Sequence, residues 1–312
     1  MITGLINKIH ANGAVGAVIP FARVDDLKND MLDLKGGEYH PAWLDRMVTH
    51  TTAAENRFLP PELNFEPRSL ITILMPGSKV ILKFRFQEMV FDCVVPPHYT
   101  NWEANNNRAL QYISDYLTPL GFSAVMALTL PQKLLAVHSG LAKYGRNNIC
   151  YNEDFGSHMQ IMTYISDMPC EDSVWLPLSR LEQCDKCRAC IIACPTGAID
   201  VNRRLINSDR CITFVDELPG EFPDWLALDA HNSIIGCTKC QDKCPANSKN
   251  NDNVTVGAKF TEKETLEILE HASNMRYSDK LAAKLKKTGI SQEYIDLFPR
   301  NLAVLMLSKG RQ

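Results

Sequence analysis

The sequence of 312 residues lacks several features that would place it in a familiar class. Its longest apolar runs fall well short of the roughly 20 residues that cross a bilayer, and no charged segment followed by an apolar stretch opens the chain as a secretory signal would. Lys and Arg (33) nearly balance Asp and Glu (36), so the net charge of -3 gives no support to nucleic-acid binding. Phosphate-binding loops, dinucleotide-binding turns and hydrolase or zinc-protease motifs are also missing. We therefore expect neither a membrane partner nor a nucleotide-dependent enzyme.

What the sequence does contain is 11 cysteines, eight of them between Cys184 and Cys244. Cys184, Cys187, Cys190 and Cys194, followed by Pro195, have the C-x2-C-x2-C-x3-C-P spacing of bacterial two-cluster ferredoxins. In that run the fourth cysteine binds the other cluster. The second run, Cys237, Cys240 and Cys244 with Pro245, is one cysteine short, and Cys211 is the natural replacement.

The eight cysteines therefore predict two 4Fe-4S clusters. One would take Cys184, Cys187, Cys190 and Cys244, and the other would take Cys194, Cys211, Cys237 and Cys240. The alternative is a pair of structural zinc sites, but zinc does not need a third cysteine followed by x3-C-P. Disulfides are disfavoured by the odd total. Cys93, Cys150 and Cys170 are left over, and we expect buried, inert thiols there.

Three segments are predicted along the chain: an α/β domain over 1–178, a ferredoxin-like module over 179–256 and a helical segment over 257–312. Apolar runs with strand character are Ala14–Ile19, Ser69–Met75, Lys79–Phe86, Met89–Val95 and Ser123–Leu130. Helical spacing marks Asn105–Leu120, and a further helix is expected between Tyr39 and Pro61. Near the end, Thr261-x-x-Glu264 is a capping box, Gly289 would end a helix that contains Leu281 and Leu285, and a last helix spans 291–309 with a break near Pro299.

Four stretches of the sequence resemble the epoxyqueuosine reductases, which belong with the reductive dehalogenases. Residues 136–148, followed by Phe155-Gly156-Ser157, are similar to that family's A-x-x-A-G-L-G-W-x-G-K-N … G-S stretch. Cys211-Ile212-Thr213 stands for its C-I-S, and residues 236–247 for its G-C-x-x-C-Q-x-x-C-P-x-N. Arg300-Asn301-Leu302-Ala303 is similar to its R-N-x-A helix. The resemblance covers about residues 69 to 305.

The resemblance implies a nitroreductase-like, cobalamin-binding α/β domain ahead of the two-cluster module, with a cluster reducing the cobalt of base-off cobalamin. The cofactor would carry the difficult chemistry, and the protein would supply binding and orientation. Carried over residue by residue, the cofactor contacts would be His138, Ser139, Gly140, Leu141, Tyr144, Gly145, Arg146, Asn147, Asn148, Ser157, His158, Thr213, Cys237 and Thr238. Without the resemblance, Gly140 and Gly145 would be read as turn residues and Tyr144 as packing.

One departure from the family concerns its proton donor. Epoxyqueuosine reductases place an Asp in a segment that corresponds to Ala124–Lys133, where this chain has no carboxylate. General acid catalysis of the family type is therefore missing from this segment, which argues against epoxyqueuosine as the substrate. Replacement acids are weak candidates only: His98, Tyr99, Tyr144 and Tyr151.

The sequence thus predicts an iron–sulfur oxidoreductase, with cobalamin implied by the resemblance and an unidentified substrate. An electron donor such as a ferredoxin or flavodoxin would supply electrons to the clusters. The alternatives are an electron-transfer protein that reduces a corrinoid protein or another redox partner, and a cobalamin-handling protein. Cysteines that must stay reduced to bind iron, together with the missing signal, predict a cytoplasmic location.

Overall fold

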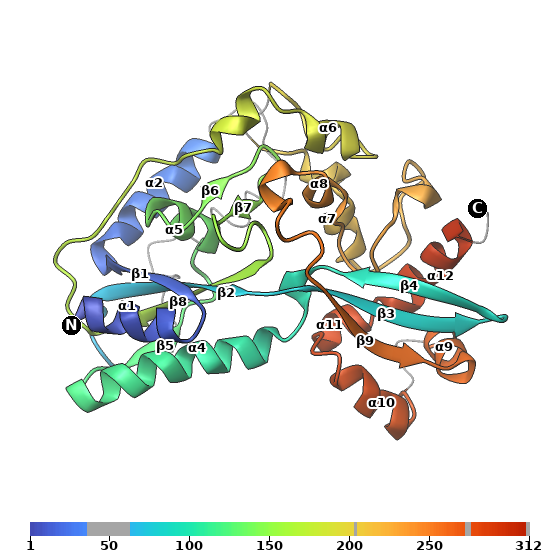
Figure 1. The fold of residues 1–312 in the computed structure, drawn as a ribbon, viewed down its shortest axis with the longest axis horizontal. Helices are drawn as coiled ribbons and strands as arrows, with labels where there is room; N and C mark the ends of the chain where they lie inside the picture. Colours follow the sequence, from blue (N-terminus) through green and yellow to red (C-terminus); the bar gives the residue numbers. More distant parts are fainter. Residues whose placement is uncertain (36–62, 203–204, 272–275, 310–312) are drawn as a thin grey trace. The chain divides into compact units, whose positions relative to one another are not determined.

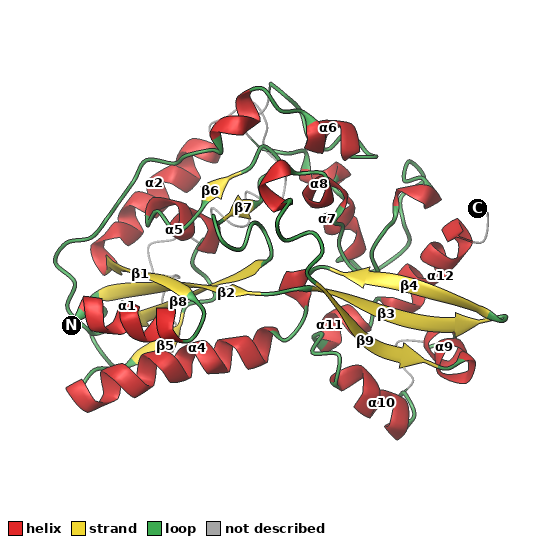
Figure 2. Ribbon diagram, viewed as in Figure 1, coloured by secondary structure: helices red, strands yellow, loops and turns green. Residues whose placement is uncertain are grey.

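A computed structural model of the chain describes residues 1–35, 63–202, 205–271 and 276–309. It separates into two compact units that alternate along the sequence (Figures 1 and 2). The first unit comprises Met1–Pro76, Asn105–Cys187 and Arg203–Leu205, and the second comprises Gly77–Ala104, Arg188–Asn202 and Ile206–Gln312. Residues 77–104 thus belong to the second unit although they lie inside the predicted segment 1–178, and the three-segment division remains a prediction about the sequence.

The first unit is built on a four-stranded antiparallel sheet in the order β1-β2-β8-β5. The strands are β1 (Val15–Pro20), β2 (Ser69–Pro76), β8 (Met159–Ser166) and β5 (Ala124–Met126). The side chains of β2 and β8 are buried almost throughout, as expected for central strands covered on both faces.

Helices cover both faces of this sheet. On one side lie α1 (Ile2–Ala11) and α4 (Trp102–Leu117), where Tyr116 donates a hydrogen bond to the Met1 carbonyl and Tyr164 of β8 bonds Asn106. On the other side α2 (Val24–Lys35) and α5 (Gln132–His138) bury Leu27, Leu134 and Leu135 against the sheet. A two-stranded ribbon follows α5 and pairs β6 (Lys143–Tyr144) with β7 (Cys150–Tyr151). The first unit therefore has three layers, α/β/α.

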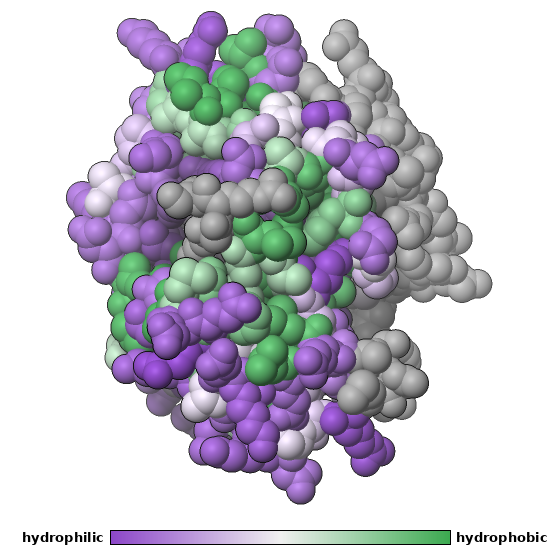
Figure 3. All heavy atoms as spheres, turned by 90° about the vertical axis from the view of Figure 1, so that its right-hand side faces the viewer, coloured by the Kyte–Doolittle hydropathy of each residue, from purple (hydrophilic) through white to green (hydrophobic). Residues whose placement is uncertain are grey.

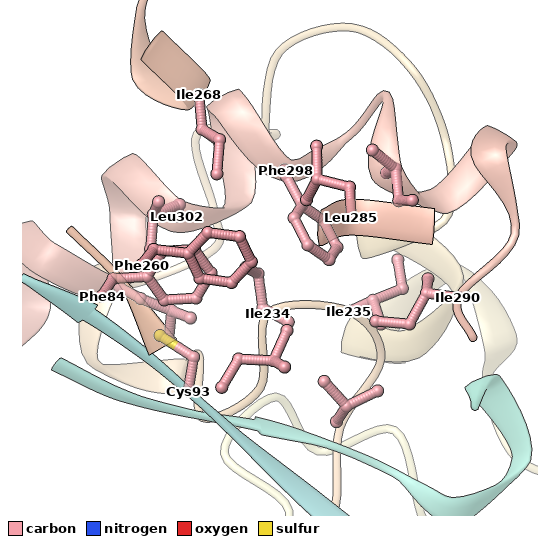
Figure 4. Packing of buried hydrophobic residues seen from close by; sticks show 14 of the residues in the cluster. Phe84, Cys93, Ile234, Ile235, Phe260, Ile268, Leu285, Ile290, Phe298 and Leu302 are labelled. Carbon is pink, nitrogen blue, oxygen red and sulfur yellow. The ribbon is translucent and has the colours of Figure 1, made fainter. Parts of the chain in front are cut away.

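The second unit contains a three-stranded sheet in the order β4-β3-β9. A hairpin joins β3 (Lys79–Phe86) to β4 (Met89–Val95), and β9 (Val254–Phe260) runs parallel to β3. One face packs on four helices, α9 (Glu262–Leu269), α10 (Asp279–Lys286), α11 (Gln292–Ile295) and α12 (Phe298–Lys309). Figure 4 shows this core, in which Phe84 and Phe260 stack with ring centroids 4.6 Å apart beside Cys93.

The iron–sulfur region of the second unit is made of very short helices separated by loops. They are α6 (Ala189–Ala193), α7 (Ile212–Asp216) and α8 (Lys239–Asp242).

On the face of the molecule shown in Figure 3, hydrophobic patches are separated by hydrophilic side chains. Exposed apolar residues of the sheet include Met89, Val90 and Val256. No helix in the described part of the chain is both long and apolar enough to cross a bilayer.

Most of the predicted elements are confirmed. β1 to β4 coincide with the predicted strands within one residue, α4 covers most of 105–120, and Thr261 and Glu264 form the predicted capping box of α9. α10 ends ahead of Gly289, and the last helix is divided at 296–297. The predicted strand over 123–130 is shorter, since only Ala124–Met126 pairs. The helix expected between Tyr39 and Pro61 lies outside the described residues.

Candidate iron–sulfur site

The four cysteines assigned to one cluster, Cys194, Cys211, Cys237 and Cys240, all belong to the second unit. Cys194 follows α6, Cys211 is the N-cap residue of α7, and Cys240 lies on α8. The Cys194 and Cys237 thiols are each near enough to Cys211 for negative charge on one to raise the pKa of the other. The fold therefore gathers three of these four sulfur atoms in one region.

Two of these thiols lie beside groups that act on their pKa. The N–H groups of Thr213 and Phe214 and the Thr213 hydroxyl act to lower the pKa of Cys211, and the N–H of Lys239 acts to lower that of Cys237. Donors near a sulfur stabilise its thiolate and tune cluster potentials. Soft sulfur ligands of this kind suit an iron–sulfur cluster.

Burial acts in the opposite direction on the same thiols. It is the main reason why the pKa of Cys211 is raised and that of Cys237 is raised to about 12. All 11 cysteines are free thiols, none of them in a disulfide. Among the described residues, no three Cys, His, Asp or Glu side chains form the ligand set of a single metal ion. Because only the thiolate binds metal, loading iron here would release protons.

The other predicted ligand set is divided between the two units. Cys184 and Cys187 lie at the end of the segment Asn105–Cys187 of the first unit, whereas Cys190 and Cys244 lie in the second. Within the second unit α6, which carries Cys190, packs against α8, which Cys244 follows by two residues. The assignment of these four cysteines to one cluster stays a prediction.

Within the first unit, the predicted cofactor loop is tied to the start of the cysteine run. The Tyr144 N–H donates to the Ser179 carbonyl, and the Leu181 N–H donates to the Tyr144 carbonyl. The Arg146 guanidinium donates to the carbonyl of Cys184. These bonds hold residues 144–146 next to a predicted cluster ligand.

The loop itself is a tight turn that needs its glycine. A Cβ on Gly145 would lie 2.5 Å from both the Asn147 side-chain oxygen and the Tyr151 ring. The Asn147 amide donates to the Tyr151 hydroxyl at 2.9 Å, and Asn148 has a left-handed φ of 58°. Gly140, with φ of 76°, makes the preceding turn. The turn reading of these glycines is therefore confirmed, whereas their contact with a cofactor stays a prediction.

His138 is held between two acceptors. Its Nδ1 lies 2.6 Å from the Leu176 carbonyl, its Nε2 lies 2.7 Å from a carboxylate oxygen of Asp30, and its ring stacks on Trp175. Both ring nitrogens are thus engaged within the first unit.

The remaining predicted cofactor contacts lie on both units. Ser139, Ser157 and His158 are buried in the first unit, and Leu141 of the same unit is half-buried. The Ser139 hydroxyl donates to the Ala136 carbonyl. In the second unit the Thr238 hydroxyl donates to Asp242 and accepts from Asn232.

The candidate replacement acids are divided between the two units. Tyr99 is buried in the second unit beside His98, and its hydroxyl donates to the Glu217 carboxylate. Burial, with the charge of Glu217, raises the pKa of Tyr99 well above 10. Tyr144 and Tyr151 lie in the first unit, where the Tyr151 hydroxyl accepts from Asn147. A tyrosine already donating to a carboxylate is a poor source of protons, which weakens the case for Tyr99.

Ala124–Lys133, which corresponds to the segment with the proton donor in the epoxyqueuosine reductases, lies in the first unit. Residues 124–126 form β5 at the edge of the first sheet, and Gln132 begins α5, with its amide donating to the Ala127 carbonyl. Neither β5 nor the first turn of α5 has an acidic residue.

A group of titratable residues near Cys211 and Cys237 was not predicted from the sequence. Asp216 and His231 are completely buried, with His231 Nδ1 3.3 Å from Asp216 Oδ1. Burial raises the pKa of Asp216, while His231 and Arg300 act to lower it. Arg300 belongs to the R-N-x-A resemblance, but nothing in the sequence indicated that it would meet Asp216 and His231.

Comparison with known proteins bears on this arrangement. A family described as a 4Fe-4S double cluster binding domain matches residues 183–247, which contain all eight predicted ligands. The chain therefore carries a double-cluster iron–sulfur domain. It is also a homologue of the epoxyqueuosine reductases. The Francisella cf. novicida enzyme of that name is 28% identical over 189 residues, 56% of this chain and 50% of that protein. The Bacillus subtilis enzyme is 32% identical over 84 residues, 27% of this chain and 20% of that protein.

Solved structures of epoxyqueuosine reductases have a similar fold. The Streptococcus thermophilus structure gives a TM-score of 0.67 at 16% identity, covering 98% of this chain and 81% of that one. An epoxyqueuosine reductase with an epoxyqueuosine-modified tRNA-Tyr stem loop gives 0.63 at 19% identity, covering 98% and 80%. The sequence matches span half or less of the length of these two curated relatives. The predicted resemblance to the epoxyqueuosine reductases is confirmed.

Proposed function

We propose that this chain is a reductase that binds two 4Fe-4S clusters and a cobalamin and delivers electrons to the cobalt. Cys184, Cys187, Cys190 and Cys244 would hold one cluster; Cys194, Cys211, Cys237 and Cys240 would hold the other. The observation that carries the proposal is the match of residues 183–247, which contain eight cysteines with free thiols, to a 4Fe-4S double cluster binding domain. Cluster potentials extend to about -700 mV, low enough for demanding reductions.

The first unit supplies side chains that fit a large polar cofactor. Ser139, Asn147, Ser157 and His158 are buried polar residues on or beside the loop that Gly140 and Gly145 shape. With Thr213, Cys237 and Thr238, they are the residues that would hold cobalamin. The bound cofactor would supply a strongly nucleophilic reduced metal centre, while these residues orient it and exclude water.

The substrate has two candidates. The curated relatives are named epoxyqueuosine reductases, and one structural neighbour contains an epoxyqueuosine-modified tRNA stem loop, so this tRNA is the first substrate to assay. The carboxylate-free segment Ala124–Lys133 favours a different substrate, one whose reduction takes its proton from another group.

A second function is favoured by the same missing carboxylate. Without its own acid, the chain would act as an electron-transfer protein, passing electrons from a ferredoxin or flavodoxin to a corrinoid protein or another redox partner in the cytoplasm. This function needs the clusters but no substrate site.

The test is reconstitution under anaerobic conditions with iron, sulfide and cobalamin, followed by gel filtration. About eight irons and about one cobalt per chain, with the EPR signal of base-off Co(II), would support the proposed reductase. Turnover of epoxyqueuosine in tRNA would then identify the substrate. About eight irons with no retained cobalt would refute cobalamin binding and leave electron transfer as the function.

A further inference from the structure

Arg300, at the start of α12, directs both terminal nitrogens of its guanidinium group at residues 215–220 of the iron–sulfur region. One terminal nitrogen donates to the carbonyls of Leu218 and Gly220, at 2.7 and 2.6 Å. The other donates to the carbonyls of Asp216 and Val215, at 3.0 and 3.4 Å. The Nε donates to the side-chain oxygen of Asn301 at 3.0 Å. All five N–H donors of an arginine are thereby accounted for.

The Val215 and Asp216 carbonyls lie at the C-terminal end of α7, the helix whose N-cap residue is Cys211, and those of Leu218 and Gly220 follow it. A cation is favoured at a helix C-terminus, and the Phe222 ring lies 4.1 Å from the guanidinium carbon. Arg300 therefore fixes one end of a helix of five residues whose other end begins at Cys211.

Asn301 joins this helix to the second cysteine loop. Its side chain is buried, and its amide nitrogen donates to the Asp216 carbonyl at 3.2 Å and to the Ile234 carbonyl at 2.9 Å. Ile234 lies three residues before Cys237, and the left-handed turn at Gly236 follows it. One amide thus bridges the segments that carry Cys211 and Cys237.

A buried carboxyl group, that of Asp216, also lies in this region. The Asp216 carboxyl is completely buried, Arg300 is its cationic neighbour on α12, and His231 lies beside it. Asp216 is also near enough to Cys237 to act on its thiol. Adding an electron to a cluster at Cys237 adds negative charge near this carboxylate, so a nearby guanidinium favours reduction.

We propose that Arg300 and Asn301 are positioning residues for the cluster of Cys194, Cys211, Cys237 and Cys240, and that the Arg300 cation raises its reduction potential. This inference rests on the proposed iron–sulfur function. It concerns one cluster of the two, which gives it a distinct signature.

The test is an anaerobic redox titration of the reconstituted holoprotein, followed by EPR, in the wild type, Arg300→Gln and Arg23→Gln. Arg23 is the matched control, because it is a half-buried arginine placed over an aromatic ring, Trp175, in the first unit. In Arg300→Gln we expect one of the two one-electron midpoints to fall, with about tenfold less reduced cluster at a fixed potential, or ~59 mV. The other midpoint, and both midpoints of Arg23→Gln, should stay at the wild-type values.

Equal shifts of both midpoints, or no shift at full iron content, would overturn the proposal. If Arg300→Gln loses iron, Arg300→Lys decides, because it keeps the charge but offers three donors in place of five. A broadened or shifted EPR signal from one cluster would then support positioning, and a wild-type signal at full iron content would refute it. Failure of the wild type itself to bind two clusters would instead contradict the proposed function.

Discussion

Burial is common to cysteines that spacing assigns to a cluster and to cysteines that it does not. Cys93 is buried in the core of the second unit, and Cys150 is buried in the first, where burial raises its pKa to about 12. Burial likewise raises the pKa of Cys211 and Cys237, although nearby N–H groups act to lower both. Burial alone therefore does not separate structural thiols from predicted ligands, and the assignment depends on spacing.

Tyr99 provides a test at the scale of a single residue. Its hydroxyl donates to the Glu217 carboxylate, and its ring lies against Gly236, where an added Cβ would come within 2.7 Å. Tyr99→Phe keeps the ring and removes a donor from the carboxylate, so we expect the free energy of unfolding to fall by about 1–3 kcal/mol. Denaturant unfolding of the holoprotein measures this loss, with Tyr112→Phe on α4 as the control.

The same variant addresses the weak catalytic assignment of Tyr99. If Tyr99 has only a structural role, the folded fraction of Tyr99→Phe should reduce a substrate of the enzyme at the wild-type rate. A loss of turnover larger than the loss of folded protein would restore Tyr99 as a proton donor.

Among the helices and strands, those that depend on residues close together in the sequence were predicted well. The hairpin of β3 and β4 and the capping box of α9 follow from alternation and spacing within a few residues. β8 was missed, because its polar residues Gln160, Thr163 and Ser166 are buried only after pairing with distant segments. β9 was missed as well, since it directly follows a polar stretch and carries Gly257.

The candidate site divides in the same way. The ligand sets follow from cysteine spacing, which is local within each run. The Arg300 and Asn301 hydrogen bonds join residues 67 to 85 positions apart, so no spacing rule could have predicted them.

The capping box gives a test at the scale of one element. Thr261 accepts from the Glu264 N–H, and the Glu264 side chain accepts from the Thr261 N–H, which satisfies two donors at the start of α9. Thr261→Ala should cost about 1 kcal/mol of stability. Hydrogen exchange of the α9 amides should be correspondingly faster in this variant. Thr261→Ser keeps the hydroxyl and should exchange like the wild type; equal exchange in all three proteins would show that the box contributes nothing.

For the whole molecule, the central claim is that one chain binds two 4Fe-4S clusters through eight cysteines. The family match over residues 183–247 supports this claim, and the predicted ligand sets make it specific. Cys211 contributes to one set only, whereas Cys93 belongs to neither. Substituting each in turn therefore separates the loss of a ligand from the loss of any buried thiol.

The most direct measurement is the iron and acid-labile sulfide content of anaerobically purified wild type, Cys211→Ser and Cys93→Ser. About eight irons and eight sulfides per chain are expected in the wild type and in Cys93→Ser, with about four of each in Cys211→Ser. Zinc in place of iron, about four irons in the wild type, or no loss in Cys211→Ser would contradict the account.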